Sequence, residues 1–210
     1  MIYASNSTED RIAVFPLGAC GDVAPSRTIE GGRTGLAEPR GLSLDAWGRL
    51  HVANRKTATV TVYAPGAQGN AAPLRVLGAG TMHTAEAIAI GHDGDVFVAS
   101  RTNGTIGGQA SIVHFRSRST HSDYTITGPR TGLTYPVGLA LADDGTLLVV
   151  AIQVARGTPS TLIGVADSAH AAVHLIRTGG VAPALRVAAV ASIAGPATGL
   201  GAAVGGLAFA

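Results

Sequence analysis

The stretch Gly41-Leu-Ser-Leu-Asp-Ala-Trp-Gly-Arg-Leu-His-Val-Ala-Asn54 recurs along the chain and decides the fold class. It lies over residues 87–100 without a gap, returns at residues 138–151, and starts once more at residues 206–210 as Gly-Leu-Ala-Phe-Ala. The copies begin at positions 41, 87, 138 and 206, so the spacing grows along the chain, as it does when insertions collect in the loops of a repeat array. The chain is therefore expected to be built from repeated structural units.

A second repeat overlaps the first and completes the unit. Residues 2–30 align without a gap with residues 50–78. Alternation of apolar residues and turn residues predicts four short strands in one unit, at residues 41–44, 49–53, 59–63 and 74–77. Four antiparallel strands in a repeat of roughly 40–50 residues are typical of a propeller blade. We therefore predict an all-β fold, a β-propeller of four-stranded antiparallel blades.

The first strand of each unit alternates large and small residues. Because side chains alternate between the two faces of a strand, each blade should have a large-residue face and a small-residue face near the axis. The large face of one blade can then pack on the small face of its neighbour. The large residues are Leu42, Leu44, Ile88, Ile90, Leu139, Leu141, Leu207 and Phe209.

The pattern Pro-x-Gly-Leu-x-Leu-(Asp)-x-x-Gly-x-Leu-x-Val-Ala-Asn of residues 39–54, followed by Thr-Val-Thr-Val-Tyr63, resembles the NHL-repeat propellers. It is also similar to their relatives, the gluconolactonase-like and streptogramin-lyase-like propellers. The resemblance covers nearly the whole chain. It implies a propeller fold and an extracytoplasmic or scaffold-type protein at least as often as an enzyme, although the start of the chain carries no visible signal peptide.

The number of blades leaves two alternatives. As a single domain over residues 1–210, the chain would have blades at residues 41–78, 87–127 and 138–190. A fourth blade would combine residues 206–210 with residues 2–30, which would close a ring without an exposed edge strand. The alternative is a fragment of a propeller with six or seven blades, the number usual among the proteins that it resembles. Deleting residues 206–210 should lower stability or cause aggregation if the ring is closed in this way.

Composition excludes several other classes of protein. The single cysteine, Cys20, allows neither an internal disulfide nor a thiolate metal cluster. The formal net charge is only +2, and the densest basic segment, Arg116-Ser-Arg-Ser-Thr-His121, is short. Nucleic-acid binding needs a concentrated basic surface, so we expect no nucleic-acid partner and interpret this segment as a solvated loop. Residues 187–210 carry no charge, but the repeat explains them better than a membrane span does.

Candidate site residues lie on the loops between strands two and three of a blade and between successive blades. These loops share one face, and the longest of them cover residues 100–110 and 151–169. Long loops on a rigid scaffold are the usual binding surface, so we expect ligand contacts there. The predicted ligand-binding residues are Asn54, His83, Glu86, Arg101 and Asn103, and Asn6, Arg40 and Asp167 belong to the same face.

Each candidate also has a structural interpretation. Asn6 and Asn54 end equivalent strands, where an asparagine side chain often caps a turn. Asp45, Asp93, Asp143 and Asp144 belong to turns on the opposite face and are expected to be turn residues.

Two functions remain open at this point. The first is a non-enzymatic scaffold without a cofactor that binds a protein, peptide or glycan on the long-loop face. The alternative is a lactonase- or lyase-like enzyme that uses Ca²⁺ or another divalent metal in the central channel, as the resemblance implies. Such an enzyme needs several oxygen or nitrogen ligands converging on the axis, with His83 and Glu86 as contributors. The innermost strands offer mainly Gly, Ala and Ser, so binding is the favoured function.

Overall fold

The structure is a computed structural model that describes residues 1–102, 109–131, 133, 135–141, 146–152, 171–177 and 191–194. The described residues form strands and one short 3₁₀ helix, η1 (Pro129–Thr131). The strands are β1 (Ile2–Asn6), β2 (Arg11–Phe15), β3 (Arg27–Ile29), β4 (Pro39–Leu44), β5 (Leu50–Asn54), β6 (Thr59–Tyr63), β7 (Arg75–Leu77), β8 (Ala87–Ile90), β9 (Val96–Arg101), β10 (Ala110–Phe115), β11 (Tyr124–Thr127), β12 (Pro136–Leu141), β13 (Thr146–Ile152), β14 (Ala171–Arg177) and β15 (Ala191–Ala194).

The strands form four antiparallel sheets in which each strand pairs with its neighbour in the chain. The first sheet contains β1–β3, and the other three contain β4–β7, β8–β11 and β12–β15. The all-β prediction and the four-stranded blades are confirmed, and β6 coincides with the strand predicted at residues 59–63. No described helix is long and apolar enough to cross a membrane.

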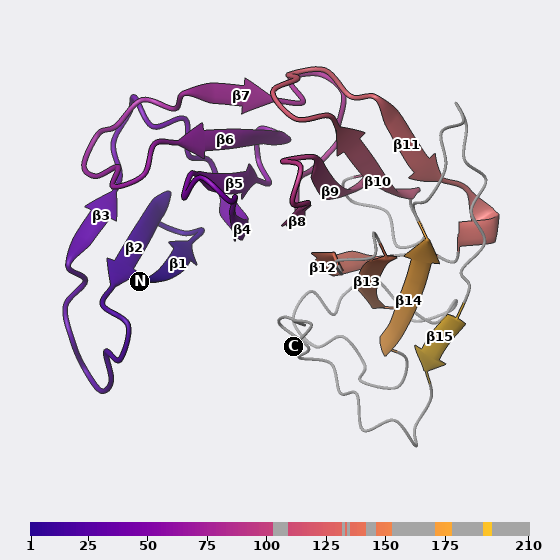
Figure 1. Cartoon of the computed structure of the whole chain (residues 1–210), viewed down its shortest axis with the longest axis horizontal. Coiled ribbons are helices and arrows are strands. Elements are labelled where there is room, and N and C mark those ends of the chain that lie inside the picture. The colour runs from indigo at the N-terminus through magenta and orange to yellow at the C-terminus, as the bar shows by residue number, and fades with distance from the viewer. Residues whose placement is uncertain are drawn as a thin grey trace.

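The four sheets follow one another around an arc (Figure 1). The first strands of the sheets, β4, β8 and β12, lie on the inner side of the arc together with β1, and β3, β7, β11 and β15 lie on the outer side. Neighbouring inner strands contact one another, since β1 contacts β4, β4 contacts β8, and β8 contacts β12. This radial order is that of propeller blades.

Apolar clusters between successive sheets form the core. Ile88 of β8 packs with Val60 and Val62 of β6 in one cluster, which also holds the fully buried Phe115. Leu139 and Leu141 of β12 pack against Ala87 and Ala89 of β8 in the next cluster. The predicted packing of large residues on the small-residue face of the neighbouring blade is confirmed at this junction.

Burial of the large-residue face is less complete at one end of the array. Leu139 and Leu141 are half-buried, whereas Ile88, which is equivalent to Leu139 in the third sheet, is buried. Both are packed against the third sheet on one side only within the described part of the chain. The fully buried large side chains belong to the first three sheets and include Tyr63, Phe115, Ile12, Ile29 and Leu77.

Gly41 allows the inner strands to approach each other closely. A Cβ atom on Gly41 would lie 2.8 Å from the Cα atom of Ala87 and 3.0 Å from the backbone nitrogen of Ile88. Both neighbouring atoms belong to the backbone of β8, so they cannot move aside as a flexible side chain would. The glycine at the start of the repeat is therefore required by packing at the axis.

Gly41→Ala should consequently lower the free energy of unfolding by about 1–3 kcal/mol, as overpacking does elsewhere. Gly32→Ala is the matched control, because nothing lies within 4 Å of the Cβ position at Gly32. Urea unfolding of both variants checks the prediction. Equal stabilities for the two variants would show that β4 and β8 are not in backbone contact at this position.

The predicted ring closure concerns residues 206–210, which lie outside the described residues, and it stays a prediction. The same holds for Asp143 and Asp144 among the turn residues. In the described turns, the prediction for aspartate is confirmed. The Oδ1 atom of Asp45 accepts hydrogen bonds from the backbone nitrogens of Trp47 and Arg49, and that of Asp93 accepts one from Asp95.

Candidate functional site

A cavity of about 610 Å³ lies where the inner strands begin, on the face predicted to carry the long loops. All four sheets contribute to its wall. Gly41, Ala87 and Gly138 line the cavity together with larger apolar residues of the same strands, among them Leu42, Ile88 and Leu139. The polar side chains that line it are Tyr3, Ser5, Ser7, Arg40 and Glu86.

Glu86 connects two loops through ion pairs. Its Oε1 atom accepts hydrogen bonds from the Nε atom of Arg55 at 3.2 Å and from the Nε atom of Arg101 at 3.0 Å. Arg55 also donates from Nη1 to the Oε2 atom of Glu38 at 2.7 Å, and the pKa of Arg55 is raised by this hydrogen bond in particular. The guanidinium of Arg101 lies 4.1 Å from the centroid of the Tyr135 ring.

These contacts join the second, third and fourth blades at the edge of the cavity. Glu38 precedes β4, Arg55 follows β5, Glu86 precedes β8, Arg101 ends β9, and Tyr135 precedes β12. Since each residue sits in a loop or at a strand end, the ion pairs fix the loops relative to one another. The site is therefore preorganised on this side.

Arg40 differs from Arg55 and Arg101 because its guanidinium takes no part in these ion pairs. Its side chain is exposed and lines the cavity, and no described residue forms a hydrogen bond or ion pair with its guanidinium. Its backbone is fixed, since the carbonyl oxygen of Arg40 accepts a hydrogen bond from the Ser5 hydroxyl at 2.8 Å. The cavity therefore offers a positive charge whose hydrogen-bond donors are not engaged by any described residue.

Of the predicted site residues, the structure brings Glu86 and Arg101 together. His83 is exposed and does not line the cavity, and its backbone nitrogen donates to the Ser100 hydroxyl at 3.3 Å. Asn103 lies outside the described residues, as does Asp167.

Asn54 has a structural position. It is fully buried, its Oδ1 atom accepts from the backbone nitrogen of Ala37, and its Nδ2 atom donates to the Thr61 hydroxyl at 3.0 Å. Asn6 likewise caps a turn, because its Oδ1 atom accepts from the backbone nitrogens of Thr8 and Glu9. Asn6 therefore caps its own turn, as its position in the repeat suggested, whereas Asn54 instead fixes the preceding loop at Ala37 and the neighbouring strand at Thr61.

Sequence reasoning missed Tyr3, Ser5 and Ser7 in the cavity and Arg55 in the ion pairs. Tyr3 and Ser5 stand in β1, which aligns with the second strand of the next copy, so nothing in the repeat placed them at the axis. Arg55 directly follows the predicted Asn54, but only the approach of Glu38 and Glu86 from neighbouring loops gives it a role.

The donor set does not suit a divalent metal at this cavity. Within the described residues, no group of three or more His, Cys, Asp or Glu side chains is placed to hold a metal ion. Glu86 is held between two guanidinium groups, and positive charges at that distance oppose the binding of a cation.

The comparisons with known proteins support the fold alone. No family model matches the chain, and no curated protein matches it. Among solved structures, it is similar to hydrazine synthase from Kuenenia stuttgartiensis, with a TM-score of 0.60 and 16% identity over 84% of this chain. The chain spans 47% of that hydrazine synthase chain, which is about half of its length. A second match, at a TM-score of 0.40 and 13% identity, is the extracellular domain of a hybrid two component system from B. thetaiotaomicron, covering 82% of this chain and 21% of that one.

The class of protein follows from the radial antiparallel sheets, from their inner strands, which contact one another, and from the cavity at the start of those strands. The chain has a β-propeller-like, all-β fold.

Proposed function

We propose that this chain is a non-enzymatic scaffold, related to the NHL-repeat propellers, that binds a protein, peptide or glycan across its long-loop face. The cavity at the inner strands receives one acidic group of the ligand. The observation that carries the proposal is the exposed guanidinium of Arg40 in the cavity wall, which no described residue pairs.

The size and the lining of the cavity support binding. Its volume of about 610 Å³ is within the range of roughly 300–1,000 Å³ that is common for ligand pockets. A guanidinium binds carboxylates with two parallel hydrogen bonds, so a carboxylate of a peptide or an acidic sugar is the complementary group. The hydroxyl groups of Tyr3, Ser5 and Ser7 add neutral donors and acceptors for the polar groups around it.

The fixed loops support a scaffold in particular. Glu38, Arg55, Glu86 and Arg101 hold three loops together without a ligand, so little conformational entropy is lost when a ligand binds. The same residues are engaged with one another, which leaves Arg40 as the charged contact for the ligand.

The test is a binding screen with defined probes. The purified chain is applied to a glycan microarray that includes uronic and sialic acids and to a peptide library, and affinities for the best probes are measured by calorimetry. Arg40→Ala should weaken binding by about tenfold or more, the loss expected for a charge-assisted hydrogen bond. Arg33→Ala is the control, because it removes the same charge from an exposed residue outside the cavity lining.

The outcomes separate the alternatives. Binding of acidic probes that depends on Arg40 and is unchanged in Arg33→Ala supports the proposal. Equal losses in the two variants would indicate a general charge effect. Failure of every acidic probe to bind, or binding that is indifferent to Arg40→Ala, would overturn it.

A further inference from the structure

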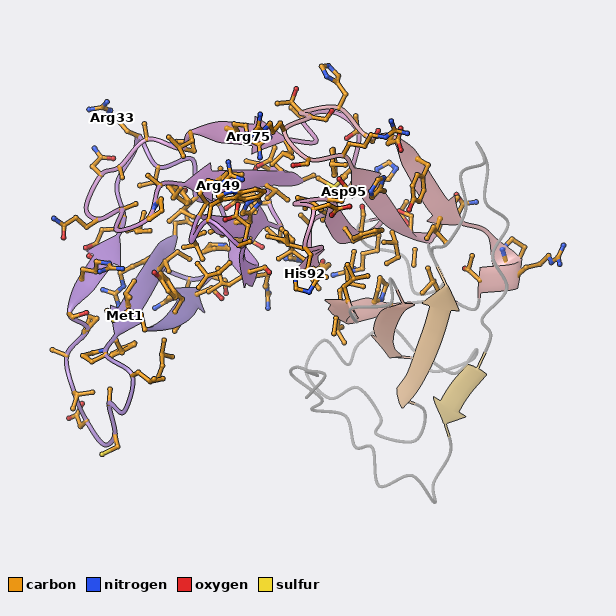
Figure 2. All side chains as sticks on the ribbon, in the orientation of Figure 1. Met1, Arg33, Arg49, Arg75, His92 and Asp95 are labelled. Atoms are coloured by element: carbon orange, nitrogen blue, oxygen red, sulfur yellow. The ribbon has the colours of Figure 1, made fainter. Side chains whose placement is uncertain are left out.

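A second basic site lies on the opposite face, between the second and third sheets, and it is independent of the cavity. The turns between strands one and two and between strands three and four of each sheet share this face. Three arginines reach it from two sheets, namely Arg49, Arg75 and Arg118. Figure 2 shows Arg49 and Arg75 on the second sheet, with Arg75 on its outer strand.

The repeat shows that Arg75 lacks a partner that its counterpart has. Tyr3, Val14 and Arg27 are in register across the first sheet, and the Nη2 atom of Arg27 donates to the Tyr3 hydroxyl at 3.2 Å. The equivalent row of the second sheet contains His51 in place of the tyrosine and Arg75 in place of Arg27.

His51 does not replace the tyrosine as an acceptor. Its Nε2 atom pairs with the Oδ2 atom of Asp45 at 3.0 Å, and its Nδ1 atom is buried without a hydrogen-bond partner. The guanidinium of Arg75 has no hydrogen bond or ion pair with any residue that the structure describes, and its Nη1 atom is buried. A buried donor without an acceptor is costly unless a ligand supplies the acceptor.

Arg118 stands at a backbone position that the repeat otherwise gives to glycine. The turns after β2, β6 and β10 are equivalent. In each of them a backbone nitrogen donates to the carbonyl oxygen three residues earlier, which belongs to Pro16, Ala64 and Arg116 in turn. The third residue of the turn is Gly18 with φ +93° in the first copy and Gly66 with φ +79° in the second. In the third copy it is Arg118 with φ +65°.

Residues other than glycine are uncommon in the left-handed region, although Asp10, Glu38 and Ala58 also adopt it here. Arg118 therefore places a positively charged side chain on this turn, where the other two copies have no side chain. The charge of the neighbouring Arg116 is already compensated, because its Nε atom is paired with the Oδ2 atom of Asp123 at 3.1 Å.

The two sheets bring the arginines close together. The backbone nitrogen of Gly78, just after β7, donates to the carbonyl oxygen of Thr120 in the loop that contains Arg118. Burial lowers the pKa of Arg75, and the charges of Arg49 and Arg118 lower it further.

Arg49 completes the group from the second sheet. Its Nε atom lies 2.6 Å from the Oδ2 atom of Asp45, and its guanidinium lies 4.7 Å from the centroid of the exposed Trp47 ring. Asp45 thus compensates the charge of Arg49. Arg75 and Arg118 form no ion pair with any residue that the structure describes, so two positive charges of the group have no partner there.

We infer that Arg49, Arg75 and Arg118 form a binding site for a doubly charged tetrahedral oxyanion, that is, a phosphate or sulfate group. Guanidinium groups from separate elements bind the several oxygens of such a group, and two net positive charges match a dianion better than a carboxylate. The oxygens of the bound group then accept hydrogen bonds from Arg75, as the Tyr3 hydroxyl accepts one from Arg27 in the first sheet.

The experiment compares inorganic phosphate, inorganic sulfate and acetate by calorimetry and by thermal unfolding, at constant ionic strength and pH 7.5. The parent should bind phosphate or sulfate saturably and acetate more weakly. Arg75→Met should weaken this binding by about tenfold or more, as the loss of a charge-assisted contact does. Arg27→Met is the matched control from the first sheet and should bind the anion like the parent.

Arg118→Gly gives a readout that a purely structural role would not produce. It restores the residue of the other two copies, so the melting temperature without anion should not fall, while anion binding should weaken. A phosphoserine peptide and a sulfated disaccharide then distinguish the two sources of the group, and the one that binds more tightly identifies the ligand. The inference is overturned if neither anion binds saturably, or if Arg75→Met and Arg27→Met bind it equally well.

Discussion

Phe115→Ala is expected to lower the free energy of unfolding by about 3–5 kcal/mol, the usual cost of removing a fully buried phenylalanine. Phe115 is completely buried in the apolar cluster between the second and third sheets. Because the sheets contact one another mainly through such clusters, a cavity at Phe115 weakens the junction between two blades and not one blade alone. Denaturant unfolding followed by circular dichroism measures the loss.

Leu74→Ala is the control for this prediction. Leu74 is also a large apolar residue next to β7, but it is 58% exposed. Its replacement should change stability by less than about 0.5 kcal/mol, as is usual at exposed positions. Similar losses for Phe115→Ala and Leu74→Ala would mean that the junction between the second and third sheets is not packed as described.

Asp45→Ala should be about as damaging, with an expected cost of about 3–5 kcal/mol, because it leaves buried partners uncompensated. The Asp45 carboxylate is buried, and its Oδ2 atom contacts the Nε atoms of both Arg49 and His51. Its Oδ1 atom holds the turn through the backbone nitrogen of Trp47. Asp93→Ala is the control from the corresponding turn of the next copy, where an exposed aspartate accepts one backbone hydrogen bond.

The pH dependence of stability gives a second readout for Asp45. Burial raises its pKa, but hydrogen bonds from His51 and Arg49 outweigh burial, so the pKa in the folded protein lies below the ordinary value. The unfolded chain therefore binds a proton more readily, and this contribution to stability is lost as the pH falls below about 4. The parent should lose stability in that range, and Asp45→Ala should lose less. A parallel decline in both proteins would contradict the role given to Asp45.

The strands could be predicted because the repeat and the apolar alternation agree. The strand at residues 59–63 was recovered with its bounds, and Asp45 was correctly assigned to a turn. Burial was harder to predict, because Leu139 and Leu141 have the same pattern as Ile88 but are only half-buried. Sequence alternation shows which face a residue takes and not how much of the neighbouring sheet covers it.

The site could be predicted only in part, because its contacts join different blades. The loop face identifies Glu86 and Arg101 as candidates, but the ion pairs of Glu86 with both Arg101 and Arg55 depend on how three loops meet. The sequence does not distinguish an asparagine that is buried with structural hydrogen bonds, as Asn54 is, from one that binds a ligand.

The basic segment at residues 116–121 held a signal that alignment of the copies could have revealed. The segment is an exposed loop, as expected, and alignment of the copies would in addition have placed Arg118 at the position of Gly18 and Gly66.

The most direct test of the proposed binding function is an NMR map of amide shifts with the tightest acidic probe from the binding screen. We expect the shifted residues to gather at the inner strands around the cavity, at Ser5, Arg40, Gly41, Glu86 and Ala87, and to disappear in Arg40→Ala. Shifts confined to the outer strands β3, β7 and β11, or retained in Arg40→Ala, would contradict the proposal that the cavity binds the ligand.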